Sequence, residues 1–317
     1  MFIKEAKKWS LLLYNYTRGE TFKIKSSYDG LMLYGLIEEP KKKPVGIVQI
    51  SHGMAENKER YKDFMKFLSN HGYIVVIHDH RGHGKSAKTE DNFGYFDENK
   101  NILKDELYEV TKFIKKKYPN LKITLFAHSM GSLVARMYIQ DYDDMIDKLI
   151  LCGAPTYNPF SLLGSLLAKI SGKIHGEKYR SKFINDLVFR KHNKSYNIPN
   201  SWICSDEKVV SKYNSSKYCG FIFTIDGFEM LFYMMRLVFT KHMYKVKNAD
   251  IPIFLIGGAN DPVIGGKRKF NHLCKFLKDV GYSNLKSKLY PNMRHEILNE
   301  KGKELVYENI LAFINDN

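Results

Sequence analysis

Short apolar runs recur along the chain at intervals that suit the strands of one β-sheet. Most of them are continuously apolar rather than alternating with polar residues, which is typical of parallel strands covered on both faces. Two further strand-like runs within residues 21–39 flank Asp29-Gly30 and predict an antiparallel hairpin. The other runs are 45–50, 73–79, 122–127, 148–153, 251–258 and 285–291. Together these runs predict an eight-stranded, mostly parallel sheet.

Helix-like segments separate most of these runs. In them apolar residues recur every three or four positions, as Val306, Ile310 and Phe313 do near the end of the chain. Strands that alternate with helices imply βαβ units and an open parallel sheet, so the predicted fold class is α/β with helices flanking the sheet. The helix-like segments are 57–70, 99–117, 131–141, 267–280 and 300–315.

One long stretch interrupts this alternation. From about Thr156 to Tyr244 no apolar run is followed by a compact crossover, and the segments are amphipathic and aromatic-rich, as in NPFSLLGSLLAKIS. A loop of that length without structure of its own is uncommon in a compact domain. We therefore expect residues 1–155 and 245–317 to form the core and residues 156–244 to form a helical cap inserted into it.

The chain carries an excess of positive charge, which raises the question of an anionic partner. Its formal net charge is +16. The lysines are scattered through every segment, with only short runs such as Lys41–Lys43 and Lys115–Lys117, and do not form the clustered basic stripe of a nucleic-acid-binding domain. We expect no nucleic-acid partner. Peripheral contact with an acidic membrane surface stays open, and the sequence does not indicate an oligomeric state.

The cysteines and the N-terminal segment bear on the compartment. Cys152, Cys204, Cys219 and Cys274 are far apart in the chain, which argues against a zinc site or a disulfide framework. The stretch WSLLLYNY (9–16) is interrupted and lacks a small-residue cleavage site, so we expect neither a signal peptide nor a membrane span. The expected location is cytoplasmic, with peripheral membrane contact left open.

Ser129 lies where the nucleophile of a serine hydrolase would lie. It follows the apolar run 122–127 and opens a helix-like segment, within AHSMG, which departs from the G-x-S-x-G pattern at Ala127. A sharp strand-to-helix turn there would lift the hydroxyl clear of the sheet. Alanine adds one methyl group, so the turn should survive. Taken alone, the motif is equally compatible with Ser129 as an ordinary helix N-cap.

Two later residues complete a candidate triad. Asp261 follows the run 251–258, and His295 follows the run 285–291. The carboxyl ends of parallel strands share one edge of the sheet, where open α/β sheets build their sites. The chain order serine, aspartate, histidine is that of a hydrolase with a nucleophile elbow. We interpret Ser129 as the nucleophile, His295 as the base and Asp261 as the acid that orients it.

The same reaction needs backbone donors for the oxyanion. One is the N–H of Met130, directly after the candidate nucleophile. The second is expected in the segment SHGMAENKERY after the third strand, where His52-Gly53 lets the chain turn tightly and Met54 offers its N–H. Met54 and Met130 are therefore the predicted oxyanion-hole residues.

A histidine-rich segment offers a rival chemistry. His78, His80 and His83 in HDHRGHGKS have the spacing of a zinc-binding H-x-H-x-D-H motif, but Gly82 replaces the required aspartate. The GKS ending would need a glycine where Asp79 lies to form a phosphate-binding loop. We expect no metal and no cofactor, and we interpret the segment as a turn that braces the rim of the site.

With these segments in place, the chain resembles the monoacylglycerol lipase and lysophospholipase branch of the α/β-hydrolase superfamily over nearly its whole length. The segment WICSDEKVVSKYNSSKYCG resembles the cap of that family, although the Asp-Pro usual near Ser216-Lys217 is missing. Ala127 and Ser132 depart from glycines of the elbow without removing a catalytic group. The resemblance rests on SHGMAENKERY, HDHRGHGKS, AHSMGS, GANDPV and MRHEILNE.

The resemblance implies an α/β-hydrolase fold with a helical cap, and a serine ester hydrolase that cleaves monoacylglycerol or lysophospholipid through an acyl-enzyme. It also implies that the cap supplies the acyl pocket, with Phe160, Leu163 and Leu167 on one helical face as candidate substrate contacts. That face either packs on the core or stays exposed to lipid. A short-chain carboxylesterase, a peptidase of the same superfamily and a non-catalytic binder remain alternatives.

Overall fold

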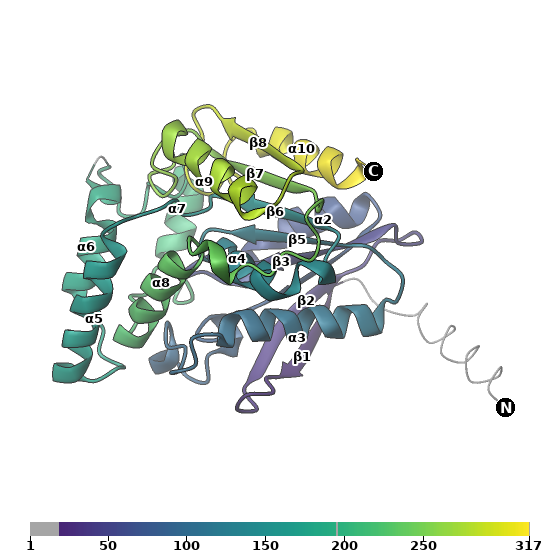
Figure 1. Ribbon diagram of the computed structural model, residues 1–317. Helices are drawn as coiled ribbons and strands as arrows, with labels where there is room; N and C mark the ends of the chain where they lie inside the picture. Colours follow the sequence, from purple (N-terminus) through teal and green to yellow (C-terminus); the bar gives the residue numbers. More distant parts are fainter. Residues whose placement is uncertain (1–18, 195, 317) are drawn as a thin grey trace.

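An eight-stranded β-sheet is the centre of the computed structural model, which describes residues 19–194 and 196–316 (Figure 1). The strand order is β1-β2-β4-β3-β5-β6-β7-β8. β1 and β2 form the predicted antiparallel hairpin, β2 is also antiparallel to β4, and the remaining pairs are parallel. The predicted mostly parallel, eight-stranded sheet is confirmed. The strands are β1 Glu20–Lys25, β2 Met32–Glu38, β3 Gly46–Ser51, β4 Tyr73–His78, β5 Ile123–His128, β6 Lys148–Cys152, β7 Ile253–Gly258 and β8 Leu285–Tyr290.

Helices flank both faces of this sheet at the predicted segments. The segment 57–70 begins as a short 3-10 helix, Lys58–Tyr61, before the α-helix starts. The last helix starts later than predicted, at Lys303, because Gly302 adopts a left-handed conformation with φ of 80° just before it. The helices are α2 Lys62–Asn70, α3 Ile102–Lys117, α4 Met130–Tyr142, α9 Lys267–Val280 and α10 Lys303–Asn315.

Alternate residues of each parallel strand feed two separate cores. In β3, Ile47 packs in the core under α3, α4 and α9, whereas its neighbour Val48 packs in the core under α2 and α10. Both side chains are fully buried. This two-sided burial explains why the strands are continuously apolar in sequence. It also fixes the register, because a slip by one residue would exchange the two cores.

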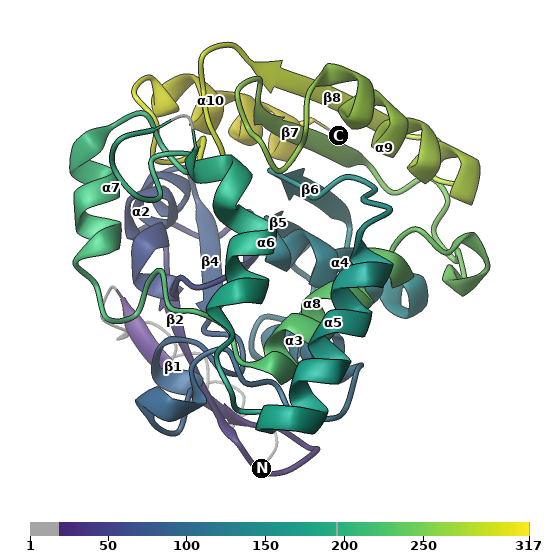
Figure 2. The same cartoon turned by 90° about the vertical axis from the view of Figure 1, so that its left-hand side faces the viewer.

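The stretch between β6 and β7 is helical, as predicted. Figure 2 looks onto its helices, which gather in front of one end of the sheet. α5 and α8 approach closely, since a Cβ on Gly164 would lie 2.6 Å from the Phe232 ring. We propose that residues 156–244 form a cap on a core of residues 1–155 and 245–317. The helices of this stretch are α5 Ser161–His175, α6 Lys182–Asn193, α7 Glu207–Asn214 and α8 Ile225–Leu237.

Two expectations from the sequence concern membranes: no signal peptide and no membrane-spanning segment. The stretch WSLLLYNY, on which the expectation of no signal peptide rests, lies outside the described residues. Within residues 19–194 and 196–316, none of the helices has both the length and the apolar character required to cross a bilayer.

Candidate active site

Ser129 lies at the sharp turn between β5 and α4. Its backbone has φ of 51° and ψ of −119°, a conformation that costs energy in a residue with a side chain and that persists where the surroundings hold it. Gly131 makes the turn possible, because a Cβ there would lie 2.2 Å from the carbonyl oxygen of Ser51. Ala127 is fully buried in β5, where it pairs with Ser51. The elbow therefore forms with alanine at the position of the usual first glycine.

The structure brings the three residues of the predicted triad into one hydrogen-bonded chain. His295 Nδ1 lies 2.8 Å from Asp261 Oδ2, and His295 Nε2 lies 2.8 Å from Ser129 Oγ. An ionised carboxylate can only accept, so the proton sits on Nδ1 and leaves Nε2 to accept from the serine hydroxyl. Asp261 and His295 are buried, whereas Ser129 is partly exposed. The serine can thus meet a substrate while its partners are shielded from water.

Close backbone approaches fix the histidine and the aspartate. Asp261 Oδ1 accepts the N–H of Val263 at 2.8 Å, which leaves its other oxygen for His295. Gly153, at the end of β6, lies so near that a Cβ there would be 3.1 Å from His295 Cε1. Gly258 would likewise place a Cβ 2.1 Å from the carbonyl oxygen of Arg294. Two glycines at strand ends thus make room for the loop that carries the histidine.

The loop after β3 presents Met54 at the same edge. His52 Nδ1 lies 2.8 Å from the Gly53 carbonyl, and the Gly53 N–H donates to Glu56 at 2.6 Å. In a trans peptide the N–H points opposite to the C=O, so the Met54 N–H points away from the His52 ring. No protein acceptor for this N–H is found among the described residues. Gly53 is next to Ser129, because a Cβ on it would lie 3.2 Å from Ser129 Cβ.

The other predicted donor is the Met130 N–H at the start of α4. Residues at a helix N-terminus have no acceptor within the helix, and the helix dipole makes this end attractive to negative charge. Ser132, the second departure from the family pattern, donates its hydroxyl to the Ser129 carbonyl at 2.6 Å. It therefore braces the elbow from within the first turn of α4.

Two of the three histidines of the HDHRGHGKS segment, His80 and His83, hydrogen-bond within the loops that surround the site, whereas neither ring nitrogen of His78 has a partner among the described residues. His83 Nε2 accepts the Ala55 N–H at 3.2 Å, and His80 Nε2 lies 2.9 Å from Ser51 Oγ. Burial lowers the pKa of His83 to about 4 and that of His78 to about 3, so both are neutral at pH 7. In the described part of the chain, no group of three or more His, Cys, Asp or Glu side chains is arranged to hold a metal ion.

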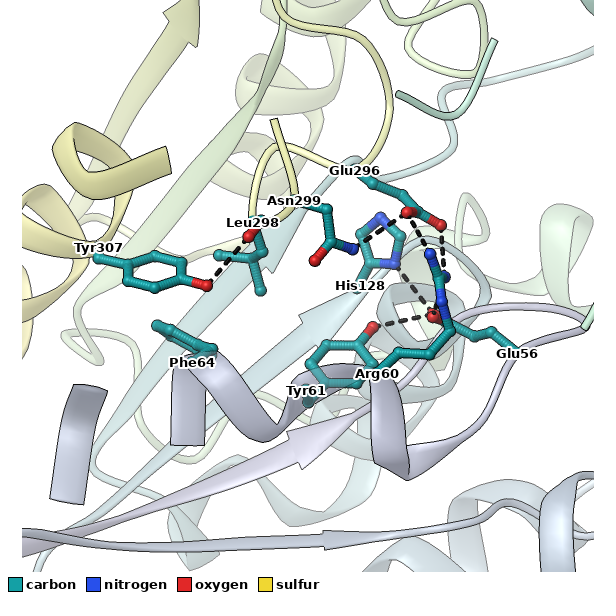
Figure 3. A pocket seen from close by; sticks show the side chains of 9 residues that line it. All are labelled: Glu56, Arg60, Tyr61, Phe64, His128, Glu296, Leu298, Asn299 and Tyr307. Atoms are coloured by element: carbon teal, nitrogen blue, oxygen red, sulfur yellow. Dashed lines mark hydrogen bonds and ion pairs between the residues drawn. The ribbon is translucent and has the colours of Figure 1, made fainter. Parts of the chain in front are cut away.

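A buried ionic cluster behind the elbow was not identified from the sequence. Arg60 donates to Glu56 at 2.8 Å and forms two hydrogen bonds of 2.6 Å with Glu296 (Figure 3). His128, directly before Ser129, lies 3.3 Å from the Glu56 carboxylate. A sequence signal existed, because each of these residues lies within or beside a motif segment. Only the fold shows that they meet.

The stretch between β6 and β7 is also attached to the histidine loop. Arg294 donates to the carbonyls of Ser201 and Cys204 at 2.6 and 2.9 Å, and the Glu296 N–H donates to the Ile203 carbonyl at 2.7 Å. The ring of Trp202 lies 5.2 Å from the ring of His295, centroid to centroid. The sequence did not point to Trp202, since an isolated tryptophan gives no periodic signal.

Two of the three candidate substrate contacts at α5 are exposed. Phe160 is 72% exposed and Leu163 is 50% exposed, whereas Leu167 is partly buried. The buried side of α5 consists instead of small residues, Ser161, Gly164, Ser165 and Ala168. Of the two arrangements expected from sequence, the one with an exposed apolar face is the one observed. Other exposed apolar side chains nearby are Leu162, Leu166, Ile170, Ile174, Phe183 and Leu187.

Comparison with known proteins identifies a family and several relatives of this chain. Residues 42–302 match the protein family described as serine aminopeptidase, S33. A monoglyceride lipase homolog of Monkeypox virus is 28% identical over 192 residues, which cover 59% of this chain and 67% of that protein. A probable lysophospholipase L2 of Haemophilus influenzae is 22% identical over 290 residues, which cover 90% of this chain and 87% of that protein.

A solved structure extends the likeness to three dimensions. The thermostable carboxyl esterase of Bacillus coagulans, crystallised in complex with glycerol, superposes with a TM-score of 0.87 at 27% sequence identity. The alignment covers 95% of this chain and 99% of the esterase. The match therefore includes the helices between β6 and β7 as well as the sheet.

Proposed function

This chain belongs to the family described as serine aminopeptidase, S33, and on that premise we propose that it hydrolyses monoacylglycerols or lysophospholipids with Ser129 as nucleophile. The relatives named monoglyceride lipase and lysophospholipase confirm the predicted branch of the α/β-hydrolase superfamily and the predicted class, a serine ester hydrolase. The observation that carries the catalytic assignment is the hydrogen-bonded chain from Asp261 through His295 to Ser129.

The geometry supports a two-step acyl transfer. His295 Nε2 takes the hydroxyl proton as Ser129 Oγ attacks the ester carbonyl, and Asp261 stabilises the imidazolium that forms. The N–H groups of Met54 and Met130 receive the negative charge that develops on the carbonyl oxygen. His295 then protonates the leaving alcohol. A water molecule activated by the same histidine releases the fatty acid from the acyl-enzyme.

The apolar surface of α5 and α6 supports a lipid substrate. Leu163, Ile170 and Phe183 are exposed by 50%, 47% and 67%, an arrangement suited to contact with acyl chains or a lipid interface. The net charge of +16 would favour acidic surfaces. We propose that this surface rests on the interface that holds the substrate and that Phe160, Leu163 and Leu167 contact lipid there.

The family description names an aminopeptidase, but the charges behind the elbow favour an ester without a free amino group. An aminopeptidase needs an anion to bind the substrate's terminal ammonium group. Apart from Asp261, which holds His295, the buried carboxylates behind the elbow are Glu56 and Glu296, and both are paired with Arg60. Both carboxylates are therefore already occupied by protein groups, Arg60 and, beside Glu56, His128, which favours an uncharged ester over a peptide N-terminus.

The test is fatty-acid release from a long-chain monoacylglycerol and from the matching lysophospholipid, with Ser129→Ala as the blank. Release by the wild-type protein, reduced at least about a thousandfold in the variant, supports the proposal. Release from the monoacylglycerol alone identifies a monoacylglycerol lipase, and equal or greater release from the lysophospholipid identifies a lysophospholipase. Hydrolysis of short esters or peptides alone would reject the lipid assignment and retain the nucleophile.

A further inference from the structure

The carboxylate of Glu56 links three segments that meet at Ser129, two of them directly and the third through Arg60. Glu56 Oε1 accepts the Gly53 N–H at 2.6 Å and the Tyr61 hydroxyl at 2.9 Å, and lies 3.3 Å from His128 Nδ1. Glu56 Oε2 accepts from Arg60 at 2.8 Å. Figure 3 shows the side chains of Arg60 and Tyr61, from the same segment as Glu56, and of His128, from β5, around this carboxylate.

Three of these four contacts lead to different parts of the proposed catalytic centre. Gly53 precedes Met54, whose N–H is the proposed first oxyanion donor. His128 precedes Ser129, and its Nε2 lies 3.4 Å from the carbonyl oxygen of His295. Arg60 extends the linkage to the histidine loop, because it donates two hydrogen bonds to the carboxylate of Glu296, the residue after His295. Glu56 thus touches the oxyanion loop and the elbow directly, and the histidine loop through one arginine.

The pKa shifts of Glu56 and His128 favour the charged form of both side chains. Burial alone would raise the pKa of Glu56, but the hydrogen bond from His128 and the charge of Arg60 outweigh it and lower the pKa, so the carboxylate stays ionised. Burial lowers the pKa of His128, yet the bond to Glu56 raises it overall. A buried ion that loses its partner is strongly destabilising, so the partners are held together tightly.

The space around the cluster is too small for a ligand. The cavity lined by Glu56, Arg60, His128, Glu296 and neighbouring side chains measures about 10 Å³. Such a volume holds no more than about one water molecule. The cluster is therefore a linkage between segments rather than a binding site for part of the substrate.

We propose that Glu56 is a positioning residue for ester hydrolysis, which keeps the oxyanion loop, the nucleophile elbow and the histidine loop in one fixed arrangement. This inference rests on the proposed function, because it assigns Glu56 a role in that same reaction. Glu56 acts through the Gly53–Met54 peptide, His128 and Arg60 and does not touch the reacting atoms. Without it the Met54 N–H and His295 would lose their common support, and displacement of about 1 Å costs up to about a hundredfold in rate.

Glu56→Gln is the test, with Glu106→Gln as the matched control. Glutamine preserves the shape and the acceptor for the Gly53 N–H, but removes the charge that binds Arg60 and His128. Glu106 is also buried and pairs with an arginine, Arg81, at 2.6 Å, but this pair joins α3 to Asp29 in the turn between β1 and β2. The measurements are kcat and KM for a soluble p-nitrophenyl ester, the rate of Ser129 labelling by a fluorophosphonate, and the thermal unfolding midpoint.

For Glu56→Gln we expect kcat and the labelling rate to fall about 10- to 100-fold, with KM within about twofold of the wild type. For Glu106→Gln we expect kcat within about twofold of the wild type, whatever the change in its thermal unfolding midpoint. The proposal is overturned if Glu56→Gln keeps wild-type kcat. It is equally overturned if both variants lose activity in proportion to their loss of stability, because the role would then be structural.

A second variant serves if Glu56→Gln does not fold. Glu296→Gln weakens the paired contact with Arg60 from the other end of the same linkage, and we expect a fall in kcat of about 3- to 10-fold. Wild-type kcat in that variant would overturn the proposal. Failure of the proposed function is distinguishable, since the wild-type protein would then show neither Ser129 labelling nor ester hydrolysis, whereas failure of the inference alone leaves both intact.

Discussion

The indole of Trp202 packs against the imidazole of His295, with ring centroids 5.2 Å apart and the planes tilted by 42°. The tryptophan belongs to the stretch between β6 and β7, and the histidine belongs to the loop after β8. The imidazole is thus held on one side by Asp261 and covered on another by a residue of the proposed cap. This contact makes the proposed cap part of what positions the base.

Replacing Trp202 tests that contact. Trp202→Ala should lower kcat about tenfold, because the imidazole gains freedom to leave its line between Ser129 and Asp261. Trp202→Phe should lower kcat less than about threefold. An aromatic face is preserved in that variant, and the indole N–H that it loses has no hydrogen-bond partner among the described residues. Steady-state kinetics on a soluble ester measures both, and equal rates for the two variants would contradict the assignment.

The elbow should tolerate a change at one of its small residues and not at the other. Gly131→Ala should destabilise the protein by at least about 2 kcal/mol and abolish activity, because the added methyl group would meet the Ser51 carbonyl at 2.2 Å. Ala127→Gly should reduce stability by only about 0.5–1 kcal/mol and keep kcat within about twofold. Urea unfolding and ester hydrolysis check both variants. A fully active Gly131→Ala protein would refute the close approach.

The exposed face of α5 should affect catalysis at interfaces only. Leu163→Gln with Ile170→Gln should reduce vesicle binding and fatty-acid release from vesicle-held substrate about tenfold or more, since each buried leucine or isoleucine contributes about 1.5–3 kcal/mol. Hydrolysis of a soluble short ester should stay within about twofold. Leu305→Gln, at a comparably exposed position (51%) on α10, is the control. Unchanged vesicle binding by the double variant would show that this face does not contact lipid.

Asp226 should make the stability of the molecule depend on pH. Burial raises the pKa of this residue to about 6, although its bonds to the N–H groups of Phe96 and Asp97 oppose the shift. A carboxyl with a raised pKa stabilises the fold below its ordinary value near 4, and this contribution is lost as pH rises through 6. The free energy of unfolding of Asp226→Asn, relative to that of the wild type, should therefore rise by about 1–2 kcal/mol as the pH goes from 5 to 7.5. Urea titrations at both pH values measure this gain, and a pH-independent difference would exclude Asp226 as the titrating group.

The core of the site could be predicted because each of the three triad residues follows the end of a strand in the sequence. Ser129, Asp261 and His295 each follow an apolar run, and parallel strands bring such positions together whatever the helices between them do. Sequence order alone then indicates which of them could meet. The same reasoning placed Met54 after β3, beside the nucleophile.

The remaining features depend on contacts that periodicity does not encode. Helical spacing on α5 identified an apolar face, but could not indicate that the opposite face, with Gly164, would be the one packed against α8. The cluster of Glu56, Arg60 and Glu296 joins segments far apart in the chain. Charged residues at such spacings are usually solvated, so burial had to be observed before these three could be recognised as a unit.

The attachment of residues 201–205 to the histidine loop limits how the molecule can open. Arg294 holds the carbonyls of Ser201 and Cys204, and Ser205 is bound through both its N–H and its hydroxyl to Glu300. A rigid-body movement of all of residues 156–244 away from the sheet would displace the loop that carries His295. Residues 201–205 therefore have to stay in place if His295 is to keep its position. The inner part of this insertion is thus anchored to the loop of the proposed base, whereas no hydrogen bond joins α5 or α6 to that loop among the described residues.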